Sequence, residues 1–146
     1  MVWGSMGWNW VGMLIEVEGR MDADKYCQIL DEGVVESFEK LEMEGEQYFQ
    51  QDNNPKHTSR KAQQWFEDND IQVLSWPAQS PDLNPIEHLW DHLHKYNTSP
   101  HGVHELWDKL VDEWNEIPPE VCQNLIESMP RRIQAVIRAK GGHTKY

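Results

Sequence analysis

The chain has 146 residues, of which 38% are hydrophobic and eight are tryptophans, and this is enough for one globular domain with its own core. Its net charge of −12 argues against a protein that binds a phosphate backbone by charge alone, because such binding depends on Lys and Arg displacing counterions. No apolar run approaches a membrane span, and Cys27 and Cys122 lie too far apart for a zinc half-site, so we expect a soluble, intracellular protein with reduced thiols and no membrane partner.

The first forty residues predict a hairpin followed by a helix. Residues 1–17 combine β-branched and aromatic residues with glycines, a pattern typical of two short strands joined by a tight turn. From Asp22, a candidate N-cap, apolar residues recur every three to four positions as far as Leu41. This spacing predicts an amphipathic helix.

A strand, a helix and a second strand are expected next. The first strand is short and ends at Asp52, and Thr58 or Ser59 can cap the helix that follows. This helix should turn Trp65 and Phe66 inward, and the apolar run at 71–77 is the second strand.

The second half of the chain predicts helices. Pro85 suits the first turn of a helix, where its missing N–H would be unpaired anyway, and Asn84 is the expected cap. A loop at 97–102 leads to a helix over 103–117. The last helical stretch begins at Pro118, and Pro130 should kink or split it.

Two carboxylates stand out by their positions. Asp52 ends a strand, where aspartate is unfavourable unless it starts a turn or has a role in catalysis, and Glu87 lies in the first turn of a later helix, with 34 residues between the two. Carboxylates placed in this way can converge on one divalent cation, which needs hard oxygen ligands. The alternative is that both are ordinary surface carboxylates.

Four stretches of sequence together resemble the DDE transposases of the mariner superfamily. They are VWGSMGW at 2–8, FQQDNNPKHTS at 49–59, WPAQSPDLNPIEHLW at 76–90 and SMPRRIQAVIRAKGGHTKY at 128–146. The motifs are long and follow one another in the order and spacing of the family. The resemblance therefore runs almost from end to end.

The resemblance implies a catalytic domain over 1–146 with an α/β, ribonuclease-H-like fold, in which a mixed sheet is flanked by helices. Asp52 and Glu87 would be the second and third members of a carboxylate triad that holds two Mg²⁺ or Mn²⁺ ions. The implied chemistry is hydrolysis of phosphodiester bonds at transposon ends, followed by attack of the freed 3′-hydroxyl on target DNA.

Four nearby residues are candidates for shaping the site, and one of them, His57, belongs to the family motif. We expect Asn53 and Pro55 to shape the turn that aims Asp52 and Asn84 to cap the helix, and the alternative for all three is contact with substrate. His57 would orient the metal ligand, and its alternative is a packing role at the helix start.

The resemblance is incomplete at the N-terminus. The family's first aspartate and its helix-turn-helix modules lie upstream of the segment that matches Val2-Trp3-Gly4, and Asp22 and Asp24 are no substitute. We therefore expect a ribonuclease-H-like fold that lacks its first strand. As an isolated fragment it should be inactive, with an unpaired strand edge that favours a homodimer.

DNA, as transposon ends and as target, is the implied partner, and the nucleus the implied location. Residues 131–146 contain five basic residues and no acidic one. Candidate phosphate contacts there are Arg131, Arg132, Arg138 and Lys140. The alternative is a basic helix end that complements the helix dipole.

Two rival interpretations remain. His88 and His92 are spaced as in the H-x-x-E-H zinc hydrolases, but Asp91 stands where that pattern requires glutamate. The other rival is a decayed or domesticated remnant that binds a partner without catalysis.

Overall fold

The computed structural model describes residues 1–42, 46, 48–94, 102–140 and 142–146. The loop expected at 97–102 lies outside the described residues, except for Gly102. Of the helices in the described ranges, none combines the length and apolar character needed to cross a bilayer.

The chain divides into two compact units, and each is described here by itself. The first contains Met1–Ser5 and Gly12–Ser80, and the second contains Met6–Val11 and Pro81–Tyr146. The expectation of one catalytic domain over 1–146 stays a prediction.

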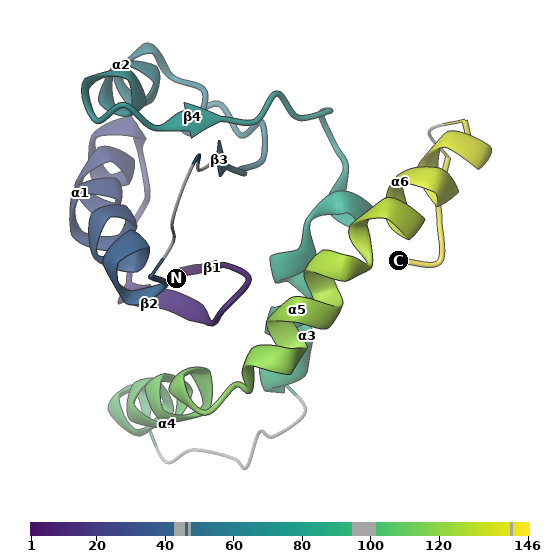
Figure 1. Ribbon diagram of the computed structural model, residues 1–146. Helices are drawn as coiled ribbons and strands as arrows, with labels where there is room; N and C mark the ends of the chain where they lie inside the picture. Colours follow the sequence, from purple (N-terminus) through teal and green to yellow (C-terminus); the bar gives the residue numbers. More distant parts are fainter. Residues whose placement is uncertain (43–45, 47, 95–101, 141) are drawn as a thin grey trace. The chain divides into compact units, whose positions relative to one another are not determined.

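The N-terminal part follows its predicted elements (Figure 1). Strands β1 (Val2–Met6) and β2 (Val11–Glu16) pair in a hairpin, as expected. Helix α1 (Ala23–Lys40) begins after Asp22, whose carboxylate accepts a hydrogen bond from the Lys25 amide at 2.9 Å. The predicted N-cap is confirmed.

The strand-helix-strand unit is also present. Strand β3 (Tyr48–Phe49) pairs in parallel with β4 (Gln72–Val73), and helix α2 (Arg60–Asp68) connects them. Ser59 caps α2. Helices α1 and α2 pack together around an apolar core, and the Trp65 indole N–H donates to the Asp31 carboxylate at 2.5 Å. The buried core comprises Val17, Met21, Tyr26, Cys27, Ile29, Leu30, Val34, Ala62, Trp65 and Phe66.

The first strand of this unit ends earlier than the sequence predicts. It stops at Phe49, three residues before Asp52. The Gln51 side chain bonds to Tyr26 and His57, and the Asp52 carboxylate accepts from the Asn54 amide at 3.1 Å. These side-chain bonds lie where the sequence predicted further strand, and the one from the Asn54 amide to Asp52 starts a turn.

The second unit is mainly helical. It contains a short 3₁₀ turn, η1 (Pro81–Leu83), and helices α3 (Pro85–His94), α4 (Val103–Asn115), α5 (Pro119–Glu127) and α6 (Met129–Arg138). Helix α3 packs against α4 and α5. The break at Ser128 between α5 and α6 confirms the effect predicted for Pro130, which lies in the first turn of α6.

Strands and helices together make a mixed α/β fold. Among the described residues the strands form two separate two-stranded sheets.

Candidate functional site

Asp52 lies at the start of a tight turn that follows β3. Its Oδ1 accepts from the Asn54 amide at 3.1 Å and contacts His57 Nδ1 at 2.5 Å. The amides of His57 and Thr58 donate to the Asn54 carbonyl at 2.8 and 3.0 Å, which closes the turn. The Asp52 side chain is 58% exposed, and its Oδ2 has no protein partner among the described residues. One oxygen of this exposed carboxylate is therefore held by hydrogen bonds, and the other is not, within the part of the chain that the structure describes.

His57 supports this carboxylate from a sheltered position. Its side chain is 18% exposed, and its ring lies on Tyr26 with 4.2 Å between centroids. Burial lowers the pKa of His57, although the hydrogen bond and charge of Asp52 act in the opposite direction. A hydrogen bond from His57 to this carboxylate oxygen requires the proton on Nδ1, because the oxygen is the acceptor.

Two residues that the sequence did not single out complete this arrangement. The Tyr26 hydroxyl donates to Gln51 Oε1, and Gln51 Nε2 donates to the His57 carbonyl at 3.2 Å. Tyr26 is 1% exposed, and burial, with the nearby charge of Asp52, raises its pKa. Tyr26 belongs to the series of apolar positions between Asp22 and Leu41, which marks it only as a core residue, and a buried tyrosine hydroxyl does require a partner.

Asn53 and Pro55 take part in the same turn. Asn53 Nδ2 donates to the Trp76 carbonyl at 2.6 Å, which links the turn to the segment after β4. Pro55 opens the run of turn residues that leads to α2. Their expected role in aiming Asp52 stays a prediction.

Glu87 occupies the first turn of α3 and is exposed. Asn84, directly before the helix, donates from Nδ2 to Glu87 Oε1 at 3.2 Å, and the Glu87 amide donates to the Asn84 carbonyl at 3.3 Å. Leu89 and Leu93, further along the helix, are buried. The carboxylate thus lies near the positive end of the helix dipole, with Oε2 left without a partner among the described residues.

The expected convergence of Asp52 and Glu87 stays a prediction, because the first residue belongs to one compact unit and the second to the other. Each carboxylate by itself fits Mg²⁺ or Mn²⁺, since each presents a hard oxygen that is not already bonded within the described part of the protein. In the described ranges, no group of three or more His, Cys, Asp or Glu side chains is placed to hold a metal ion.

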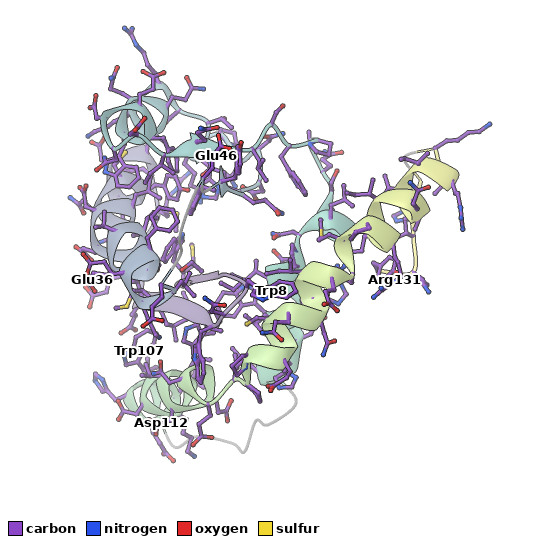
Figure 2. The ribbon with its side chains drawn as sticks, in the orientation of Figure 1. Trp8, Glu36, Glu46, Trp107, Asp112 and Arg131 are labelled. Atoms are coloured by element: carbon purple, nitrogen blue, oxygen red, sulfur yellow. The ribbon has the colours of Figure 1, made fainter. Side chains whose placement is uncertain are left out.

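The basic C-terminal segment divides into exposed and buried residues. Arg131, Arg138 and Lys140 are exposed, and Figure 2 shows Arg131 on α6. Arg132 is only 2% exposed, and this differs from the expectation of a phosphate contact. Its guanidinium donates to Ser128 Oγ at 2.6 Å and to the Asp82 carbonyl at 3.0 Å.

The burial of Arg132 has a structural explanation. Its guanidinium lies 5.0 Å from the ring centre of Tyr146. The Asp82 carboxylate accepts from the hydroxyl and amide of Thr144, and these bonds lower the pKa of Asp82. Arg132 therefore connects η1, α6 and the C-terminal residues. Its charged group makes its contacts inside the second unit.

Comparison with known families and curated proteins gives one consistent result. Residues 11–106 match the family described as DDE superfamily endonuclease. The chain is 40% identical over 148 residues to the transposable element Tcb2 transposase of Caenorhabditis briggsae and 41% identical to the Tc1 transposase of Caenorhabditis elegans. Each alignment covers 100% of this chain and 54% of the transposase, so the chain spans about half the length of these relatives.

Solved structures agree with the sequence comparison. The catalytic domain of Mos1 mariner transposase superposes with a TM-score of 0.79 at 23% identity, covering 99% of this chain and 74% of that one. The Mos1 paired end complex with Mn gives a TM-score of 0.82 at 25% identity, over 94% of this chain and 43% of that one. The fold is therefore the mixed α/β, ribonuclease-H-like fold of that catalytic domain.

Proposed function

Because the chain belongs to the DDE superfamily of endonucleases, we propose that it acts as part of the catalytic domain of a transposase that cuts and joins DNA. The observation that carries this proposal is the Asp52 turn, in which His57 holds one oxygen of an exposed carboxylate and the other has no hydrogen-bond partner among the described residues. A carboxylate with one unbonded oxygen is better explained as a metal ligand than as a residue that only starts a turn.

The proposed metal ligands are Asp52 and Glu87, each oriented by a neighbouring side chain. His57 fixes the first carboxylate and Asn84 contacts the second, while Asn53 and Pro55 shape the turn before α2. The Mos1 catalytic domain has been solved with Mg in one structure and with Mn in another. A pair of such ions, when bound, would activate the attacking oxygen and stabilise the leaving oxygen of a phosphodiester.

DNA is the proposed substrate. Mos1 transposase has been solved as a paired-end complex with the left transposon end. We propose the same kind of partner here, and with it a nuclear location and a homodimer. Arg131 and Arg138 are the proposed phosphate contacts of α6, because they are seven residues apart, on one helical face, and both are exposed.

Replacing Arg131 and Arg138 together by alanine should weaken binding to duplex DNA and reduce its salt dependence. Each lost phosphate contact lowers the slope of log K against log salt by about 0.9, so the double variant should lose about 1.8. The measurement is fluorescence anisotropy of a labelled duplex over a range of salt concentrations. Arg20→Ala with Arg60→Ala removes the same charge from exposed positions of the first unit. Equal slopes for both double variants would show that α6 does not contact phosphate.

Iron-directed cleavage tests the proposed metal site as a whole. Fe²⁺ can replace Mg²⁺ at oxygen ligands, and with ascorbate and peroxide it produces hydroxyl radicals that cut the nearby backbone. We expect two clusters of cuts, one around Asp52 and one around Glu87, which excess Mg²⁺ suppresses. Mass spectrometry of the fragments identifies both positions.

Asp52→Asn is the informative variant for this experiment, because it should remove the cuts near Glu87 as well as those near Asp52. This result requires one shared site. Cuts near Glu87 that persist in Asp52→Asn would contradict the proposal. If the wild type is cut only around His88 and His92, and not around Asp52, the result would favour the zinc-hydrolase alternative.

A further inference from the structure

A continuous series of contacts runs from the core of the first unit to the Asp52 carboxylate. It begins at Tyr26 in α1, whose hydroxyl donates to Gln51 Oε1. Gln51 Nε2 donates to the His57 carbonyl at 3.2 Å, and His57 Nδ1 contacts Asp52 Oδ1 at 2.5 Å. All four residues belong to the first unit.

Tyr26 contributes twice to this series. Besides bonding to Gln51, its ring lies on the His57 imidazole with 4.2 Å between centroids and 35° between planes. His57 is therefore held at its ring by Tyr26 and at its backbone by Gln51. Among the described residues, neither Tyr26 nor Gln51 forms a hydrogen bond with Asp52 itself.

Packing alone does not explain why His57 is held both at its ring and at its backbone. An exposed aspartate has several accessible rotamers, and ordering such a side chain costs conformational entropy. A ligand held in one rotamer before binding avoids that cost, and the residues behind a metal ligand commonly change its metal affinity about 10- to 100-fold. A buried anchor such as Tyr26 can hold the imidazole still.

We propose that Tyr26 and Gln51 are positioning residues that hold His57 in place and, through it, fix the carboxylate of Asp52 in one orientation for a divalent cation. This inference rests on the proposed function, because it assumes that Asp52 is a metal ligand.

Two measurements on the complete chain test the proposal. The first is NMR of the His57 imidazole at pH 8, well above the usual histidine pKa of about 6.5, where nitrogen shifts identify which atom carries the proton. The second is Mn²⁺ affinity from electron paramagnetic resonance. In the wild type we expect the proton on Nδ1, as required for donation to Asp52.

Tyr26→Phe removes the hydroxyl and keeps the ring, and Gln51→Met removes both Gln51 hydrogen bonds at a half-buried position where unfolding is not expected. Both variants should mix the two imidazole tautomers and weaken Mn²⁺ binding about tenfold. Tyr48→Phe is the matched control, since Tyr48 is 47% exposed on β3, and it should change neither measurement.

The outcomes separate this inference from the proposed function. If Tyr26→Phe and Gln51→Met both behave as Tyr48→Phe does while Asp52→Asn loses Mn²⁺, the positioning role is wrong and the metal site stands. If Asp52→Asn keeps full Mn²⁺ affinity, the proposed function is wrong, and the inference falls with it. Should Tyr26→Phe fail to fold, Gln51→Met decides alone.

Discussion

Replacing Asp52 by asparagine should lower the affinity of the chain for Mn²⁺ more than tenfold, and Glu87→Gln should do the same. Residues behind a metal ligand already contribute about 10- to 100-fold, and loss of the ligand's charge should cost at least as much. Both substitutions preserve size at exposed positions, so folding should be unaffected. Electron paramagnetic resonance of free Mn²⁺ gives the affinities, and thermal unfolding gives the check on folding.

The variant with both substitutions, Asp52→Asn and Glu87→Gln, distinguishes one shared cation site from two separate sites. If the two carboxylates hold the same cation, either substitution alone destroys the site, and the second adds little to the loss. If they bind separate ions, the losses are independent. Glu36→Gln with Asp108→Asn removes the same charge at exposed helical positions and should leave Mn²⁺ affinity unchanged. If the losses of Mn²⁺ affinity caused by Asp52→Asn and Glu87→Gln add up in the double variant, this would contradict a shared site.

The elements that the sequence predicted well are those governed by local chemistry. Asp22 and Ser59 cap α1 and α2 because their side-chain oxygens reach amides only three residues away. Pro130 splits the last helical stretch because it cannot donate the backbone hydrogen bond. The hairpin also follows from neighbouring residues, since the two strands are joined by a short connection.

The features that the sequence did not predict depend on contacts between distant residues. Strand β3 ends at Phe49, and two residues later the Gln51 side chain bonds to Tyr26, 25 positions away. Arg132 is buried because the Asp82 carbonyl, 50 positions earlier, accepts its hydrogen bond. A basic residue in a basic segment carries no local sign of such a partner. The same is true of the link from Tyr26 to His57.

In the second unit, Trp114→Ala should lower the free energy of unfolding by about 3–5 kcal/mol, the usual cost of removing a buried aromatic side chain. Trp114 is 1% exposed and stacks on Trp90 with ring centroids 5.0 Å apart. A stacked pair contributes about 0.5–1.5 kcal/mol beyond the buried area. Since domains are stable by only about 5–15 kcal/mol, the loss should be plain in urea unfolding.

Trp8→Ala is the control, because Trp8 is 46% exposed at the hairpin tip, and it should cost less than about 1 kcal/mol. The stack also concerns the candidate site, since Trp90 follows Glu87 by three residues, about one turn along α3. Loosening Trp90 should disturb the helix start that presents Glu87. At temperatures where Trp114→Ala remains folded, its Mn²⁺ affinity should therefore fall below that of Trp8→Ala. Equal affinities, with Glu87→Gln still impaired, would show that Glu87 is held by Asn84 and its own turn without help from the tryptophan pair.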